Sequence, residues 1–171
     1  MSIKNFNKTV EDIPTCILTC DKLTNDALKC RKRLEDYGFS DIKLTYGDND
    51  DRLTNKKIHW QARSFISTCL DMIENDTEYV FIFEEDAEIV ENRSDKFKRS
   101  IEWALQNKDK WDIIYGGCAA LNPMFPSLDN LDLSYSSKAQ AGAHSMLFSL
   151  HAAKEYVKYN GPDYDLPFDM A

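Results

Sequence analysis

Short apolar segments alternate with amphipathic segments along this chain. The apolar segments are rich in β-branched and aromatic residues, which predicts strands at Thr15–Thr19, Ile42–Tyr46, Tyr79–Phe83, Asp112–Tyr115 and roughly Ala143–Leu150. Between them, apolar residues recur at helical spacing in segments that begin near Thr24 or Asn25, before Phe65, at Ser94 and near His151. This alternation predicts an α/β fold with a mostly parallel central sheet flanked by helices.

The third predicted strand contains the most informative pattern. All five residues of Tyr79–Phe83 are apolar or aromatic, which is typical of a central strand covered on both faces. Four acids follow within five residues, in the segment Glu84-Glu85-Asp86-Ala87-Glu88. Ligands of open α/β sheets bind at the carboxyl ends of strands, and crowded carboxylates are favourable only beside positive charge. The pattern therefore predicts a Mg²⁺ or Mn²⁺ site that holds a phosphorylated ligand, although a solvated acidic turn explains it equally well.

Length, net charge and the absence of long apolar runs exclude several classes of protein. The 171 residues suit one domain, and 21 basic against 29 acidic residues give a net charge of −8, which disfavours nucleic-acid binding. The densest basic group, Lys29 to Arg33, lies within one predicted helix and is interpreted as a solvated face. No apolar run approaches the roughly 20 residues of a transmembrane helix, and the N-terminus lacks the features of a secretory signal.

The cysteines indicate the compartment. There are five, an odd number without zinc-like spacing, at positions 16, 20, 30, 69 and 118. We expect all five to be reduced thiols, which predicts a cytoplasmic protein.

Several segments together resemble glycosyltransferase family 25, the GT-A-type enzymes that include lipooligosaccharide and collagen sugar transferases. YVFIFEEDAEIV, residues 79–90, resembles the family's apolar strand followed by Glu-Asp-Asp, and GAHSMLFS, residues 142–149, resembles its Gly-Thr-His strand. Ala152, Ala153 and Tyr156 resemble its small-residue helix, and Asp165–Asp169 resembles its Pro-x-Asp tail. A first strand ending near Thr19 and the Gly116-Gly117 pair after the fourth strand also fit.

The resemblance implies a single GT-A-like, Rossmann-like domain over residues 1–171, possibly truncated at its C-terminus. It implies an inverting, hexosyltransferase-type enzyme that moves a sugar from a nucleotide-diphosphate donor, a UDP-sugar above all, to a hydroxyl of a glycan or protein. The cofactor would be Mn²⁺ or Mg²⁺, with Asp86 and Glu84 as metal ligands. Thr19, Asp50, Glu84 and Glu85 would contact the nucleotide sugar. Asp169 would be the general base, and His144 would act near the donor or acceptor.

Three departures from the family leave a second class of protein open. The chain has no Arg in the segment Leu23–Ala27, no Asp-Gly after the second strand, and no Ser-His at the following helix start. The alternative is a non-catalytic module that binds a glycan or a partner protein. A nucleotidyltransferase is a third reading, but the Gly-rich basic loop that often accompanies its acids is missing from the sequence.

Overall fold

The computed structural model describes residues 10–53, 59–88, 94–120 and 141–160. Five strands and four helices follow one another in the order β1 (Thr15–Thr19), α1 (Thr24–Asp36), β2 (Ile42–Tyr46), α2 (Trp60–Glu74), β3 (Tyr79–Glu84), α3 (Ser94–Gln106), β4 (Ile113–Ala120), β5 (Ala141–Ser149) and α4 (Leu150–Asn160). The α/β class predicted from the sequence is confirmed.

The five strands form one mixed sheet in the order β2-β1-β3-β5-β4. β1 is parallel to both β2 and β3, whereas β5 is antiparallel to both β3 and β4. The sheet is therefore mixed, and the expectation of a mostly parallel sheet is not confirmed, because β5 runs opposite to its neighbours β3 and β4. β4 and β5 are consecutive in the chain and adjacent in the sheet, and adjacent antiparallel strands need no helical crossover between them.

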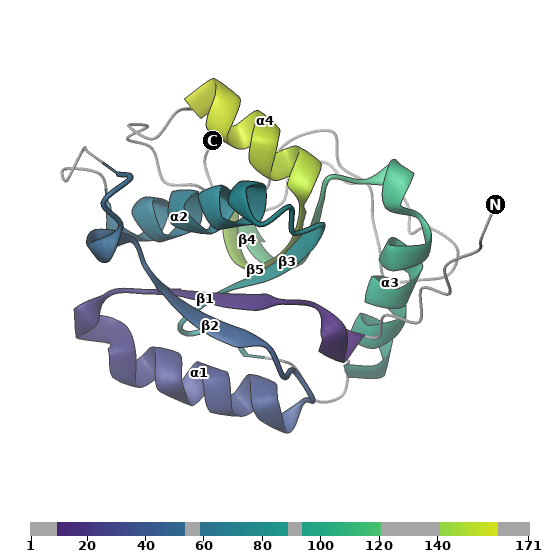
Figure 1. The fold of residues 1–171 in the computed structure, drawn as a ribbon. Coiled ribbons are helices and arrows are strands. Elements are labelled where there is room, and N and C mark those ends of the chain that lie inside the picture. The colour runs from purple at the N-terminus through teal and green to yellow at the C-terminus, as the bar shows by residue number, and fades with distance from the viewer. Residues whose placement is uncertain (1–9, 54–58, 89–93, 121–140, 161–171) are drawn as a thin grey trace.

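Helices cover both faces of the sheet and make three layers. Figure 1 shows α2 and α4 together on one face of the sheet and α1 on the other, and residues of α3 pack into the same core as those of α1. Alternate residues of β3 serve the two faces, as expected for a central strand. Tyr79, Phe81 and Phe83 pack towards α1 and α3, whereas Val80 and Ile82 pack towards α2 and α4.

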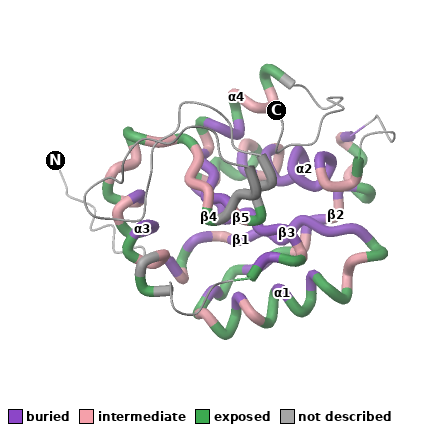
Figure 2. The backbone as a smooth tube through the Cα atoms, turned by 180° about the vertical axis from the view of Figure 1, so that it is seen from behind, coloured by how far each residue is buried: buried purple, intermediate pink, exposed green. Residues whose placement is uncertain are grey.

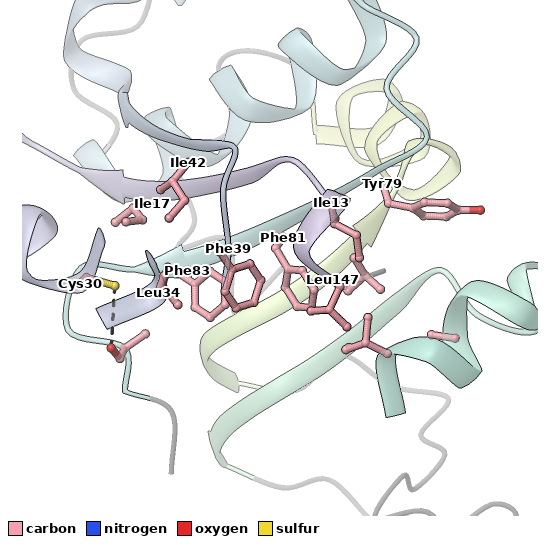
Figure 3. Packing of buried hydrophobic residues seen from close by; sticks show 14 of the residues in the cluster. Ile13, Ile17, Cys30, Leu34, Phe39, Ile42, Tyr79, Phe81, Phe83 and Leu147 are labelled. Atoms are coloured by element: carbon pink, nitrogen blue, oxygen red, sulfur yellow. Dashed lines mark hydrogen bonds between the residues drawn. The ribbon is translucent and has the colours of Figure 1, made fainter. Parts of the chain in front are cut away.

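The core on the α1 side is largely aromatic. The ring of Phe39 meets Phe81 and Phe83 edge to face, with ring centroids 5.6 and 5.8 Å apart (Figure 3). Figure 2 shows buried strands at the centre and an α1 whose outward positions are exposed. This division of the helix into a buried and an exposed face explains its 3.6-residue apolar period.

Cys16, Cys20, Cys30 and Cys69 are free and buried, while the side chain of Cys118 lies outside the described residues. The presence of five reduced thiols and the cytoplasmic location stay predictions. Within the described ranges, no helix combines the length and the apolar character that crossing a bilayer requires.

Gly47, in the loop after β2, packs directly against the backbone of α2. We expect Gly47→Ala to destabilise the protein. A Cβ at this position would lie 2.2 Å from the backbone nitrogen of Ser64, which cannot move without moving α2. The substitution should lower the free energy of unfolding by roughly 3 kcal/mol or more, measured by urea denaturation. Gly116→Ala is the control, because its Cβ would meet the rotatable hydroxyl of Ser145. Equal losses in the two variants would contradict this explanation.

Candidate metal centre

Strand alternation and register bring Glu84 and His144 together. β3 and β5 are antiparallel, with Phe83 opposite Ser145, so the next pair along the ladder is Glu84 and His144. Glu84 continues the side of β3 that carries Val80 and Ile82, which is the face covered by α2 and α4. Glu84 and His144 are therefore cross-strand neighbours on one face, at the carboxyl end of β3.

Asp86 joins these two side chains to form a cluster. His144 Nδ1 lies 2.8 Å from Glu84 Oε2 and 3.9 Å from Asp86 Oδ1. One ligand atom from each of the three residues lies within 4.8 Å of the others. Glu84 is only 9% exposed, whereas the side chains of His144 and Asp86 are 50% and 68% exposed. The cluster thus has a buried base and an open, solvent-facing side.

Gln61 holds Glu84 from the first turn of α2. Its Nε2 donates a hydrogen bond to Glu84 Oε1, while His144 Nδ1 contacts Glu84 Oε2. Each carboxylate oxygen therefore has one protein partner and keeps a second lone pair. This arrangement fixes the orientation of Glu84 without exhausting its capacity to bind a cation.

A tight turn carries the remaining acids out of the sheet. The amide of Ala87 donates to the carbonyl of Glu84 over 3.1 Å, which closes a four-residue turn with Glu85 and Asp86 at its centre. Glu85 is half-buried, and its Oε2 has no hydrogen-bond partner among the described residues. A buried carboxylate oxygen without a partner is costly unless positive charge lies nearby.

Burial and neighbouring negative charge raise the pKa of both Glu84 and the half-buried Glu85. Burial raises the pKa of the Glu84 carboxyl above its ordinary value, and the charges of Asp86 and Glu85 add to this rise, whereas His144 opposes it. Burial likewise raises the pKa of Glu85, with Asp86 and Asp26 contributing in the same direction. The cluster as it stands is therefore short of positive charge.

The other predicted site residues are placed differently. Thr19 ends β1 at the same edge of the sheet, one residue beyond the Leu18–Glu84 pair, but it is fully buried and its hydroxyl donates to the Cys20 carbonyl. The structure therefore brings together Glu84, Asp86 and His144, with Glu85 in the same turn. Asp169 lies outside the described residues.

Asp50 belongs to an ion-pair network on α2. Its carboxylate accepts hydrogen bonds of 2.6 Å from both Arg52 Nη2 and Ser67 Oγ, and Arg52 also contacts Asp71 and Glu74. The hydrogen bonds from Arg52 hold the pKa of Asp50 well below its ordinary value. These contacts occupy the carboxylate that the resemblance implied as a contact of the nucleotide sugar.

We expect Asp50→Asn to destabilise the protein by about 2 kcal/mol at neutral pH, because it removes charge-assisted hydrogen bonds. The pKa of Asp50 is lower in the folded than in the unfolded chain, so the ionised carboxylate stabilises the fold above the ordinary pKa of 3.8. This contribution begins to be lost as the pH falls below about 5, and the loss continues well below 3.8 until the carboxylate is protonated in the folded chain as well.

Thermal unfolding across that pH range provides the measurement. Wild type should lose more stability than Asp50→Asn on acidification. The control is Asp51→Asn, a neighbouring exposed acid, which should behave as wild type. A pH dependence in Asp50→Asn as steep as that of wild type would contradict the assignment.

Sequence reasoning missed Gln61. A usable signal was present, because the helix that follows a parallel strand begins near the strand's carboxyl end. Polar residues in the first turn of such a helix are therefore candidates for a site at that edge. Which of those residues reaches Glu84 depends on how α2 is rotated over the sheet, and the sequence pattern does not specify this.

A cavity of about 280 Å³ lies elsewhere, between α4 and the beginning of β4. Its lining is mostly apolar and includes Ile113, Phe148 and Tyr156. Asp112 and Phe148 mark the opposite end of the sheet from Glu84, so this cavity is separate from the acidic cluster.

Comparison of the sequence with protein-family models and with curated proteins found no match.

Proposed function

We propose that this protein is a metal-dependent glycosyltransferase with a GT-A-like domain. It would transfer a sugar from a nucleotide-diphosphate donor, a UDP-sugar above all, to a hydroxyl of a glycan or protein acceptor. The observation that carries the proposal is the Glu84–Asp86–His144 cluster at the carboxyl edge of the sheet. This is the edge where ligands of open α/β sheets bind.

The donor atoms of the cluster suit a divalent cation. Two carboxylates and one imidazole form a mixed oxygen and nitrogen set, which favours Mn²⁺ over Mg²⁺ because Mg²⁺ prefers oxygen ligands alone. The 2.8 Å between Glu84 Oε2 and His144 Nδ1 is close to the separation of neighbouring ligands around one ion. The exposure of Asp86 and His144 leaves room for diphosphate oxygens and water. A bound cation would also offset the charge of the half-buried Glu85.

Each residue then has a stated task. When bound, the metal would supply Lewis-acid stabilisation of the charge on a leaving diphosphate. Glu84 and Asp86 bind and place the cation, and Gln61 orients Glu84. His144 Nδ1 contacts Glu84 in the metal-free chain and would exchange this contact for the cation as its third ligand, which would leave the second ring nitrogen, Nε2, for the donor or acceptor. Inverting displacement needs a general base to take the acceptor proton, and Asp169 is proposed for that role.

A non-catalytic module that binds a glycan or a partner protein is the second candidate. It is favoured by the observation that two residues expected to contact the nucleotide are not available to do so. Thr19 is fully buried, and Asp50 is occupied by Arg52 and Ser67. A transferase would therefore have to contact the nucleotide through other groups at this edge.

A screen of nucleotide-diphosphate sugars separates the two candidates. Binding and hydrolysis of each donor are measured twice, once with Mn²⁺ present and once with a chelator in place of Mn²⁺. The transferase predicts that at least one donor binds and is slowly hydrolysed only when Mn²⁺ is present. Absence of metal-dependent binding for every donor would favour the binding module and reject the proposed function.

A further inference from the structure

Two residues of α1, Cys30 and Arg33, form hydrogen bonds to the turn that carries Asp86. The turn runs from Glu84 to Ala87, and both of its end carbonyls face Cys30, whose Sγ lies 3.6 Å from the Glu84 oxygen and 3.8 Å from the Ala87 oxygen. Figure 3 shows Cys30 with a dashed hydrogen bond of this kind. Arg33, one helical turn along the same face, donates from Nη2 to the Ala87 carbonyl over 2.9 Å.

The stronger of the two contacts comes from Arg33. A thiol is a weak donor, whereas a guanidinium N–H to a carbonyl is a charge-assisted hydrogen bond. Arg33 Nη1 also lies 3.8 Å from Glu88 Oε1, so the same side chain reaches past the end of the turn. Ala87 itself is buried in the core beside Cys30. The turn is thus anchored at its ends, and its centre projects towards His144.

Arg33 differs from the other basic residues of α1. Lys29, Arg31 and Lys32 form ion pairs with acids of the same helix and are exposed, which agrees with a solvated face. Arg33 is half-buried and instead contacts a segment 54 residues away in the chain. This long-range contact points to a task other than helix solubility.

We infer that Arg33 is a positioning residue for the metal centre, since it fixes the turn that places Asp86 beside Glu84 and His144. The inference rests on the proposed function, because it assigns Arg33 a role in metal binding at the same site. Outer contacts that orient ligands commonly change metal affinity by 10- to 100-fold when removed.

A purely electrostatic role for Arg33 predicts the opposite sign. A positive charge near the cluster repels a cation, so removing it would strengthen metal binding. A positioning role predicts weaker binding, because the turn that carries Asp86 would no longer be held. The direction of the change in Mn²⁺ affinity therefore distinguishes the two roles.

The experiment compares Arg33→Gln with Arg31→Gln in the full chain, using Mn²⁺ alone as the probe in a calorimetric or electron paramagnetic resonance titration. Both variants lose one positive charge from α1, but Arg31 contacts only Glu35 among the ion pairs described. We expect Arg33→Gln to bind Mn²⁺ about 10-fold or more weakly and Arg31→Gln to bind as wild type does. Equal or tighter binding by Arg33→Gln would overturn the inference.

Hydrogen exchange of the metal-free proteins tests the anchoring separately. Amides of residues 85–88 should exchange faster in Arg33→Gln than in Arg31→Gln. Unchanged exchange would overturn the inference whether or not metal binds, whereas a wild type that binds no Mn²⁺ would reject the proposed function instead. If Arg33→Gln does not fold, Arg33→Lys and Arg31→Lys replace the pair. Lysine keeps the charge but offers one ammonium in place of a planar fork, so Arg33→Lys should still bind Mn²⁺ more weakly than its control.

Discussion

Asp86→Asn is expected to abolish Mn²⁺-dependent binding of the nucleotide-sugar donor while leaving the fold intact. The side chain of Asp86 is 68% exposed at the centre of a turn, so the substitution should change stability little. It keeps the shape but removes one of the two carboxylates that would hold the cation. Because loss of outer contacts alone costs 10- to 100-fold in metal affinity, loss of a ligand should cost ~100-fold or more.

Asp21→Asn is the matched control for this prediction. It removes the same charge from an exposed residue that follows β1, and Asp21 is not part of the three-residue cluster. Donor affinity with and without Mn²⁺ is measured by calorimetry in both variants. Similar losses in both would indicate a general effect of negative charge, and wild-type affinity in Asp86→Asn would remove Asp86 from the site.

Asp169→Asn is expected to lower sugar transfer by ~10²-fold or more, the usual contribution of a positioned general base. Metal and donor binding should stay close to wild type, because the base acts on the acceptor hydroxyl. The prediction comes from the resemblance of the tail Asp165–Asp169 to the Pro-x-Asp segment of family 25 enzymes. Initial rates of transfer at saturating donor provide the measurement.

Asp165→Asn is the control, since it makes the same change in the same tail. Wild-type transfer by Asp169→Asn would exclude Asp169 as the base and make His144 the next candidate, because the ring nitrogen of His144 that does not contact Glu84 can accept a proton in the neutral imidazole. Loss of fold in Asp169→Asn would instead favour a capping role for this residue.

Local signals predicted most of the secondary structure. β1 and β2 have the bounds that their β-branched and apolar residues predict, and α3 begins at Ser94 as expected. β4 was predicted to end at Tyr115 but extends to Ala120. Gly116 and Gly117 have low strand propensity, and pairing with β5 overrides it there.

The sequence by itself determined the chemical inventory of the site. Four acids after an all-apolar strand and a histidine at the start of another strand were visible as separate signals. Strand β3 is central because both of its faces are apolar, and a central strand in an open α/β sheet ends where ligands bind. Patterns of this kind are short-range, so a single segment is enough to reveal them.

Only the tertiary structure decided which of these residues meet. Glu84 and His144 are 60 residues apart, and the antiparallel register of β3 and β5 pairs them. A one-residue slip would have turned His144 to the other face. The same dependence on long-range packing brings Gln61 to Glu84, Arg33 to Ala87 and Ser67 to Asp50. Local periodicity specifies the face on which a side chain lies, whereas its partner depends on how the elements pack in three dimensions.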